Sequence, residues 1–134
     1  MITITNEIVP LDTYLQLRVA SGLTAKTPAA AAIGLKNSLY AVAVKDGDNY
    51  IGMGRVIGDG GCFCQVVDIC ILPGYQGRGL GKEIMARIRT YIDEQLPEGC
   101  YISLLADGKA DQLYAQFGFK ETMPHSKGMA MKKG

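Results

Sequence analysis

A cluster of glycines marks the stretch of the sequence whose chemistry is easiest to assign. These glycines follow an apolar run that ends at Pro73 and precede an amphipathic segment from Leu80 to about Leu96. That order predicts a strand, a loop and a helix. Glycines leave backbone N–H groups uncovered, and the start of a helix favours negative charge. The sequence therefore predicts a site for a phosphate-bearing ligand at residues 76–82, built on Gly77, Gly79 and Gly81.

Two common phosphate loops can be tested by spacing, and both fail. A P-loop that ends at Gly81-Lys82 would need its first glycine at Gln76, and Glu83 stands where Ser or Thr would hold magnesium. A dinucleotide fingerprint would need its third glycine at Lys82 or Ile84. Both failed spacings argue against a nucleotide, which stays a third possibility for the ligand.

A third pattern, [QR]-x-x-G-x-[GA], is filled by Gln76, Gly79 and Gly81. With the apolar strand before it and the long helix after it, this stretch resembles the GNAT superfamily of acetyl-CoA-dependent N-acetyltransferases. In that family the loop cradles the pyrophosphate of coenzyme A. The resemblance implies that acetyl-CoA or CoA is the co-substrate. It implies contacts from Gln76, Gly77, Arg78, Gly79, Leu80, Gly81 and Lys82.

The segment from Leu113 to Phe119 resembles the family's second hallmark, an aromatic-rich helix end closed by Gly-Phe. In many relatives a tyrosine at the position of Tyr114 protonates the departing CoA thiolate. A phenol with a pKa of about 10 is neutral at pH 7 and can give its proton to a thiolate. The alternative is a core tyrosine at a contact between helix and sheet.

The strand before the loop has an implied role of its own. In the family a backbone N–H on this strand binds the oxyanion of the tetrahedral intermediate, and the strand edge pairs with the pantetheine arm. By position these contacts come from Ile69, Cys70 and Ile71.

Asp68 is the one acid in this otherwise apolar strand. Partial desolvation would raise the pKa of its carboxyl, which suits it to bind or deprotonate an amine and would favour a cationic acceptor. The alternative is an ion pair with a structural arginine such as Arg55. Some relatives carry their base near Gln65, where glutamine cannot serve, so Asp68 or a water relay is left. Cys70 as a nucleophile and His125 as a base are weaker candidates.

Composition excludes several classes of function. The chain has 134 residues, 48% apolar content and a net charge of +1, which predicts one globular domain over residues 1–134 and no nucleic-acid partner. No apolar run approaches the ~18–20 residues of a membrane span, and the N-terminus lacks the pattern of a signal peptide. A cytoplasmic location is the default. Four cysteines without a C-x-x-C pair and one histidine predict reduced thiols and no metal site.

Periodicity and turn residues give the order β-α-α-β-β-β-α-β-α-β-β. The sequence predicts an α/β (α+β) domain, and the order resembles the GNAT fold, with a mixed sheet of about six to seven strands and about four helices. The unit from residue 62 to 106 should place two strands in parallel. The strands are expected at 2–8, 38–45, 50–57, 62–72, 100–106, 119–121 and 126–132, and the helices at 11–20, 27–36, 79–96 and 109–117.

The sequence thus favours acetyl transfer from acetyl-CoA to the primary amine of a small molecule, in a ternary complex. A protein or peptide amine is the alternative acceptor, and a CoA-binding sensor without catalysis is the alternative class. The resemblance to the family is the only ground for expecting a homodimer.

Overall fold

The computed structural model describes all 134 residues. They form two compact units, Met1–Leu104 and Leu105–Gly134, each described by itself. That the two make up one domain stays a prediction. The first unit contains β1 (Ile2–Thr5), α1 (Leu11–Ala20), α2 (Pro28–Lys36), β2 (Tyr40–Asp46), β3 (Asn49–Gly58), β4 (Phe63–Ile71), a 3-10 turn η1 (Pro73–Tyr75), α3 (Leu80–Gln95) and β5 (Tyr101–Ser103); the second contains α4 (Asp111–Ala115).

The five strands form one mixed sheet in the order β1-β2-β3-β4-β5. The first four strands are antiparallel neighbours, and β5 lies parallel to β4 after the crossover through α3. The predicted parallel pair is confirmed, and the neighbouring strands β2 and β3 form an antiparallel hairpin. The predicted α/β class is confirmed as well, with five strands instead of six or seven.

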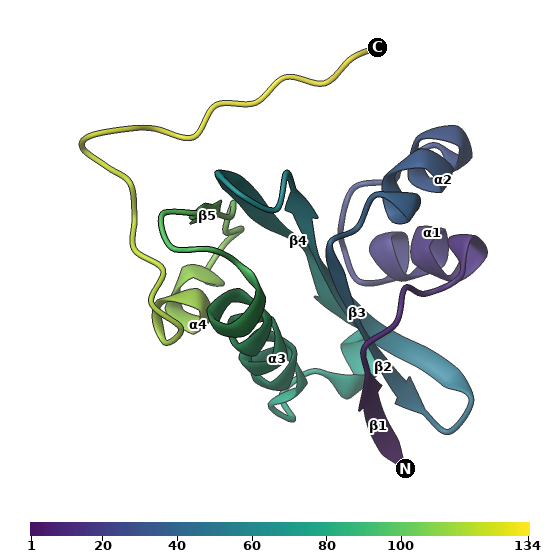
Figure 1. The fold of residues 1–134 in the computed structure, drawn as a ribbon. Coiled ribbons are helices and arrows are strands. Elements are labelled where there is room, and N and C mark those ends of the chain that lie inside the picture. The colour runs from purple at the N-terminus through teal and green to yellow at the C-terminus, as the bar shows by residue number, and fades with distance from the viewer. The chain divides into compact units, whose positions relative to one another are not determined.

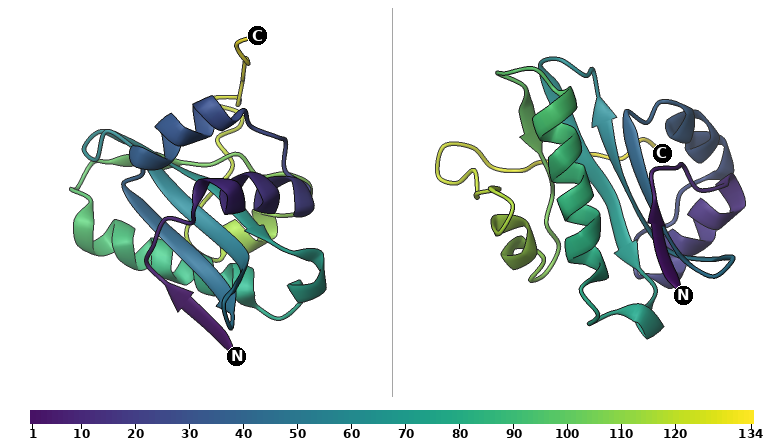
Figure 2. Two further views of the ribbon diagram at one scale, coloured as in Figure 1. Left: turned by 90° about the vertical axis from the view of Figure 1, so that its right-hand side faces the viewer. Right: turned by 60° about the horizontal axis from the view of Figure 1, so that its bottom comes forward.

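Helices cover both faces of the sheet. Figure 1 shows α1 and α2 on one face and α3 on the other, and both views of Figure 2 agree. On the first face α1 packs against β3 and β4, while on the second α3 packs against β2, β3 and β4. The strand β4 therefore lies between the two helical layers, which explains its long apolar run.

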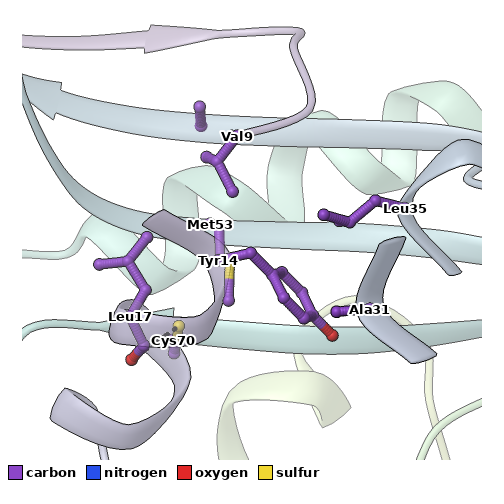
Figure 3. Close-up of a cluster of buried hydrophobic side chains, with 8 residues drawn as sticks. Val9, Tyr14, Leu17, Ala31, Leu35, Met53 and Cys70 are labelled. Carbon is purple, nitrogen blue, oxygen red and sulfur yellow. Dashed lines mark hydrogen bonds between the residues drawn. The ribbon is translucent and has the colours of Figure 1, made fainter. Parts of the chain in front are cut away.

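Each helical layer buries its own apolar cluster. Tyr14, Leu17 and Leu35 meet Met53 and Cys70 of the sheet on the α1 and α2 side (Figure 3). On the α3 side the fully buried side chains are Ile84, Met85 and Ile88. Burial of each such side chain contributes roughly 1.5–3 kcal/mol, so these contacts fix where α3 begins relative to β4.

Local sequence explains the helix starts that matter most. The Thr27 hydroxyl accepts a hydrogen bond from the Ala30 N–H at 3.2 Å, and Pro28 occupies the first turn of the predicted helix. Helix α3 instead begins after Gly79, which has φ of +78° and gives no side-chain cap. That helix start leaves its first N–H groups without partners from the chain.

The C-terminal part differs from the prediction. Residues 119–121 and 126–132 form no strands. A local turn forms instead, in which the Ser126 N–H donates to the Thr122 carbonyl and the Thr122 hydroxyl donates to the Ser126 carbonyl, both at 3.1 Å. This stretch is short, mostly polar and interrupted by Pro124 and Gly128, so it lacks an apolar face to hold a strand pair. The predicted strand at 100–106 shrinks to β5, whose Tyr101 is exposed, and the predicted helix at 109–117 shrinks to α4.

Candidate active site

The glycine loop presents an uninterrupted row of backbone donors. The first hydrogen bond of α3 runs from the Glu83 N–H to the Gly79 carbonyl at 3.1 Å, and the N–H groups of residues 77–82 donate to no acceptor in the chain. Gly77 and Gly79 have φ of +80° and +78°, and a Cβ at either would meet no atom within 4 Å. The Leu80 side chain is buried, so only its backbone faces the loop. Such a row fits a pyrophosphate.

Contacts on both sides hold this loop in place. The Gln76 side chain donates to the Ile71 carbonyl at 3.0 Å, which ties the loop to the end of β4. The Tyr75 hydroxyl donates to Asp46 at 2.6 Å, and the Arg78 guanidinium lies 5.0 Å from the Tyr75 ring centre. Arg78 and Lys82 are both exposed, so their charges remain available to a phosphate.

Beside the loop, β4 has an open edge. Its pairing with β5 is limited to residues 63–65, so residues 66–71 have no partner strand on that side. The Leu72 N–H donates to the Ile51 carbonyl of β3 at 2.9 Å. Because N–H groups of a strand alternate in direction, the Ile71 N–H faces away from β3 and toward the open edge. That edge can accept an added extended chain.

A bulge interrupts β4 next to this edge. Cys70 pairs with Met53 and Val67 pairs with Arg55, so Asp68 and Ile69 together oppose the single residue Gly54. Asp68 has φ of +63° and is the only residue besides glycine with a positive φ. A bulge of this kind bends the strand and increases its twist, and it commonly stands beside active sites.

The Asp68 side chain points into a buried polar cluster. The Arg55 guanidinium donates to one carboxylate oxygen at 2.6 Å, and the Arg18 guanidinium donates to the other. The Tyr14 hydroxyl lies 3.0 Å from both oxygens. Burial, followed by the Asp68 carboxylate, raises the pKa of Tyr14 above its ordinary value, so this hydroxyl stays a donor. We call these four residues the Asp68 cluster.

This geometry corresponds to the ion-pair alternative for Asp68. Both carboxylate oxygens already accept hydrogen bonds, and the two guanidinium groups more than neutralise the single negative charge. Little of the carboxylate is left to take a proton from an amine, and its charge no longer argues for a cationic acceptor. The Cys70 thiol lies in the same layer, where burial raises its pKa to about 11, and a thiol of this kind is a poor nucleophile.

Tyr114 belongs to the second unit. It lies in α4, half-buried, with its ring edge-to-face to Phe119 at 6.5 Å between centroids. Burial and then the Asp107 carboxylate raise the pKa of its phenol, so the proton is held at neutral pH. His125 lies in the same unit and is exposed. Across the whole structure, no group of three or more His, Cys, Asp or Glu side chains converges, and no helix has the length and apolarity to cross a membrane.

Two members of the Asp68 cluster were missed by sequence reasoning. The sequence pattern indicates that Tyr14 belongs to the apolar stripe of α1 and that Arg18 is an ordinary cation in the last helical turn. The available signal was their i, i+4 spacing, which places both on one helix face with the buried Leu17 beside them. A buried arginine needs a negatively charged partner to offset its desolvation, and Asp68 was the one acid in the apolar strand without an assigned partner.

Comparison with known proteins identifies the family. A family model described as an acetyltransferase (GNAT) domain matches residues 36–121, which include β2 to β5, the glycine loop and Tyr114. The chain belongs to the GNAT family. The resemblance expected from the loop and from the segment around Tyr114 is thereby confirmed at the level of the family.

Solved structures and curated relatives agree with this assignment. A protein of unknown function from methicillin-resistant Staphylococcus aureus, named a probable acetyltransferase, is 47% identical with a TM-score of 0.94, over 99% of this chain and all of that one. A GNAT family protein from Streptococcus pneumoniae is 26% identical with a TM-score of 0.79, over 99% and 98% of the two chains. Histone acetyltransferase TAP1 of Glycine max is 35% identical over 59% of this chain and 33% of its own length. The chain thus spans about a third of the length of TAP1 and of two other curated relatives that it matches.

Proposed function

We propose that the chain transfers an acetyl group from acetyl-CoA to the primary amine of a small molecule, by direct attack in a ternary complex. The observation that carries the proposal is the row of unpaired N–H groups at residues 77–82, next to the open edge of β4. One element offers donors for a pyrophosphate and the other offers an edge for the arm that bears the thioester. Few other ligands combine a pyrophosphate with an extended amide chain.

The chain's own residues supply three functions in this proposal. The loop N–H groups, with Arg78 and Lys82, bind phosphate charge. The edge from Ile69 to Ile71 aligns the arm, and a backbone N–H there stabilises the developing oxyanion. Acetyl-CoA supplies the activated acyl group when it is bound.

Proton transfer is assigned to groups outside the Asp68 cluster. Tyr114 is proposed as the acid that returns a proton to the thiolate, since its phenol keeps its proton at neutral pH. The amine proton is proposed to leave through water, because both oxygens of Asp68 are occupied by other donors. Asp68 then contributes to position and not to proton transfer.

A second acceptor class is favoured by one observation. A curated relative is named a histone acetyltransferase, so we include a protein amine among the acceptors to be tested. A CoA-binding module without catalysis would share the glycine loop but would have no use for a proton donor at Tyr114. Possible homodimer formation and a cytoplasmic location remain expectations from the sequence.

Release of CoA thiol from acetyl-CoA across a panel of amines tests the proposal. The panel contains small cationic, neutral and anionic primary amines together with lysine-containing peptides. Turnover with a small amine, lowered at least tenfold by Tyr114→Phe, is the expected result. Turnover with peptides alone would reassign the acceptor, and tight CoA binding without turnover on any amine would favour the sensor. Unchanged turnover in Tyr114→Phe would remove Tyr114 from the acid role.

A further inference from the structure

The strained backbone of β4 coincides with the most densely bonded polar cluster of the protein. The backbone of Asp68 has a left-handed φ, which residues other than glycine rarely adopt. Such a conformation persists only where surrounding groups enforce it. Three side chains donate to this one carboxylate, from α1 and β3. The structure therefore both strains Asp68 and anchors it.

The anchors are themselves held from a second direction. The Arg18 side chain also donates to the Thr24 carbonyl at 2.8 Å and to its hydroxyl at 3.0 Å. The Arg55 side chain also donates to the Gly34 carbonyl at 3.1 Å and the Ser38 hydroxyl at 2.9 Å. The loop after α1 and the end of α2 are thus linked through Asp68 to β4.

Position in the strand gives the cluster a consequence for the open edge. The last pair between β4 and β5 is Gln65 with Ser103, and the bulge at Asp68 and Ile69 begins three residues later. Because a bulge bends its strand, the conformation of Asp68 sets the direction of the edge that follows it. That edge contains Ile69 and Ile71, the backbone proposed to face the thioester.

We propose that Tyr14, Arg18 and Arg55 are positioning residues for acyl transfer, which hold Asp68 in its left-handed conformation and so fix the β4 edge against the thioester arm. This inference rests on the proposed function. Buried ion pairs stabilise a fold weakly, because desolvation offsets their attraction, so we assign this cluster a role in selecting one conformation of β4. The Asp68 cluster, which we also call the clamp, therefore acts on geometry. Its loss would misplace the reacting carbonyl, while the phosphate loop would still bind CoA.

The variant Tyr14→Phe tests the clamp with little disturbance. It removes the hydroxyl that donates to Asp68 and keeps the buried ring, while both arginines remain paired. The matched control is Tyr40→Phe, which removes one hydroxyl hydrogen bond, to Asn6 at 2.8 Å, away from the cluster. We expect kcat for thiol release to fall on the order of tenfold to hundredfold in Tyr14→Phe. The dissociation constant for CoA should stay within about twofold of wild type, since the phosphate loop is unchanged.

Two readouts separate positioning from a purely structural role. Amide resonances of residues 68–71 should shift in Tyr14→Phe and stay in place in Tyr40→Phe. In Asp68→Asn, which tolerates left-handed φ, kcat should fall while the pH at which the acidic limb of the rate profile bends stays the same. Disappearance of that limb would make Asp68 the base and overturn the proposal.

Failure of the inference differs from failure of the proposed function. Wild-type protein that binds no CoA would refute the proposed function and, with it, the catalytic half of the inference. Wild-type turnover with an unchanged kcat in folded Tyr14→Phe would overturn the inference alone. Unshifted amides at residues 68–71 would overturn the clamp whatever the activity.

Discussion

Gly54→Ala probes the junction of the bulge with α3. Gly54 is the single β3 residue opposite Asp68 and Ile69. A Cβ added there would lie 2.7 Å from Cδ1 of Ile69 and 2.8 Å from Cγ2 of Ile84. Both distances are well below ordinary contact between carbon atoms, so the Ile69 side chain and α3 would have to shift away from β3.

Overpacking of this kind typically costs about 1–3 kcal/mol of unfolding free energy. Two methyl groups are involved here, and Ile84 is fully buried, so we expect the upper half of that range. Urea unfolding followed by circular dichroism measures the change through the midpoint at constant slope. Because α3 starts at the phosphate loop, affinity for CoA should fall as well.

Gly34→Ala is the matched control. Gly34 lies inside α2, and a Cβ there would meet nothing within 4 Å. This variant should leave stability unchanged or raise it by up to about 1 kcal/mol, because alanine favours a helix. Gly54→Ala/Ile69→Val, which removes Cδ1 of Ile69, should be more stable than the sum of the two single changes. A Gly54→Ala protein as stable as wild type would refute the packing described at the bulge.

Three other outcomes follow from the structure. Gly79→Ala should cost about 1–2 kcal/mol of stability, because φ is +78° with free space around the Cβ, and should weaken CoA binding at least tenfold by calorimetry; unchanged affinity would argue against the loop site. Burial raises the pKa of the Cys70 thiol from 9.0 to about 11, so the folded state holds this proton longer than the unfolded state does. Stability present below pH 9 should therefore decline by up to about 3 kcal/mol as the pH rises from 9 to 11, and the decline should be shallower in Cys70→Ala; equal slopes would contradict this assignment. Thr27→Ala should cost about 1 kcal/mol in urea unfolding through loss of the cap to Ala30, and no loss would mean the cap is not formed in solution.

The parts of the site that the sequence predicted are those encoded locally. Gly77, Gly79 and the amphipathic period of α3 lie within one short stretch, and each residue's role follows from its neighbours in the chain. The strand before the loop was also predictable from its apolar run. Because the glycine loop needs only backbone groups, no distant side chain had to be found.

The Asp68 cluster could not be predicted in the same way. Tyr14 and Arg18 reach Asp68 from 54 and 50 residues away along the chain. Their pairing depends on how α1 lies on the sheet, which periodicity does not specify. The bulge that turns Asp68 inward depends in turn on Gly54 and on the register of β3 against β4.

The prediction of two C-terminal strands was wrong because it relied on local sequence alone. Strands were expected at residues 119–121 and 126–132, yet a strand pair is stable only when it buries a face. Met129 and Met131 are both more than nine-tenths exposed, so no such face forms.

Calorimetric titration with CoA and with pantetheine tests the central claim most directly. Pantetheine keeps the arm proposed to pair with β4 but lacks the pyrophosphate proposed to bind residues 77–82. Hydrogen bonds to charged groups contribute about 1.5–3 kcal/mol each, so losing even two of them should weaken binding on the order of a hundredfold or more. We predict that CoA binds at least a hundredfold more tightly than pantetheine and that Gly79→Ala removes most of this difference. Equal affinity for the two ligands, or no binding of CoA, would contradict the account.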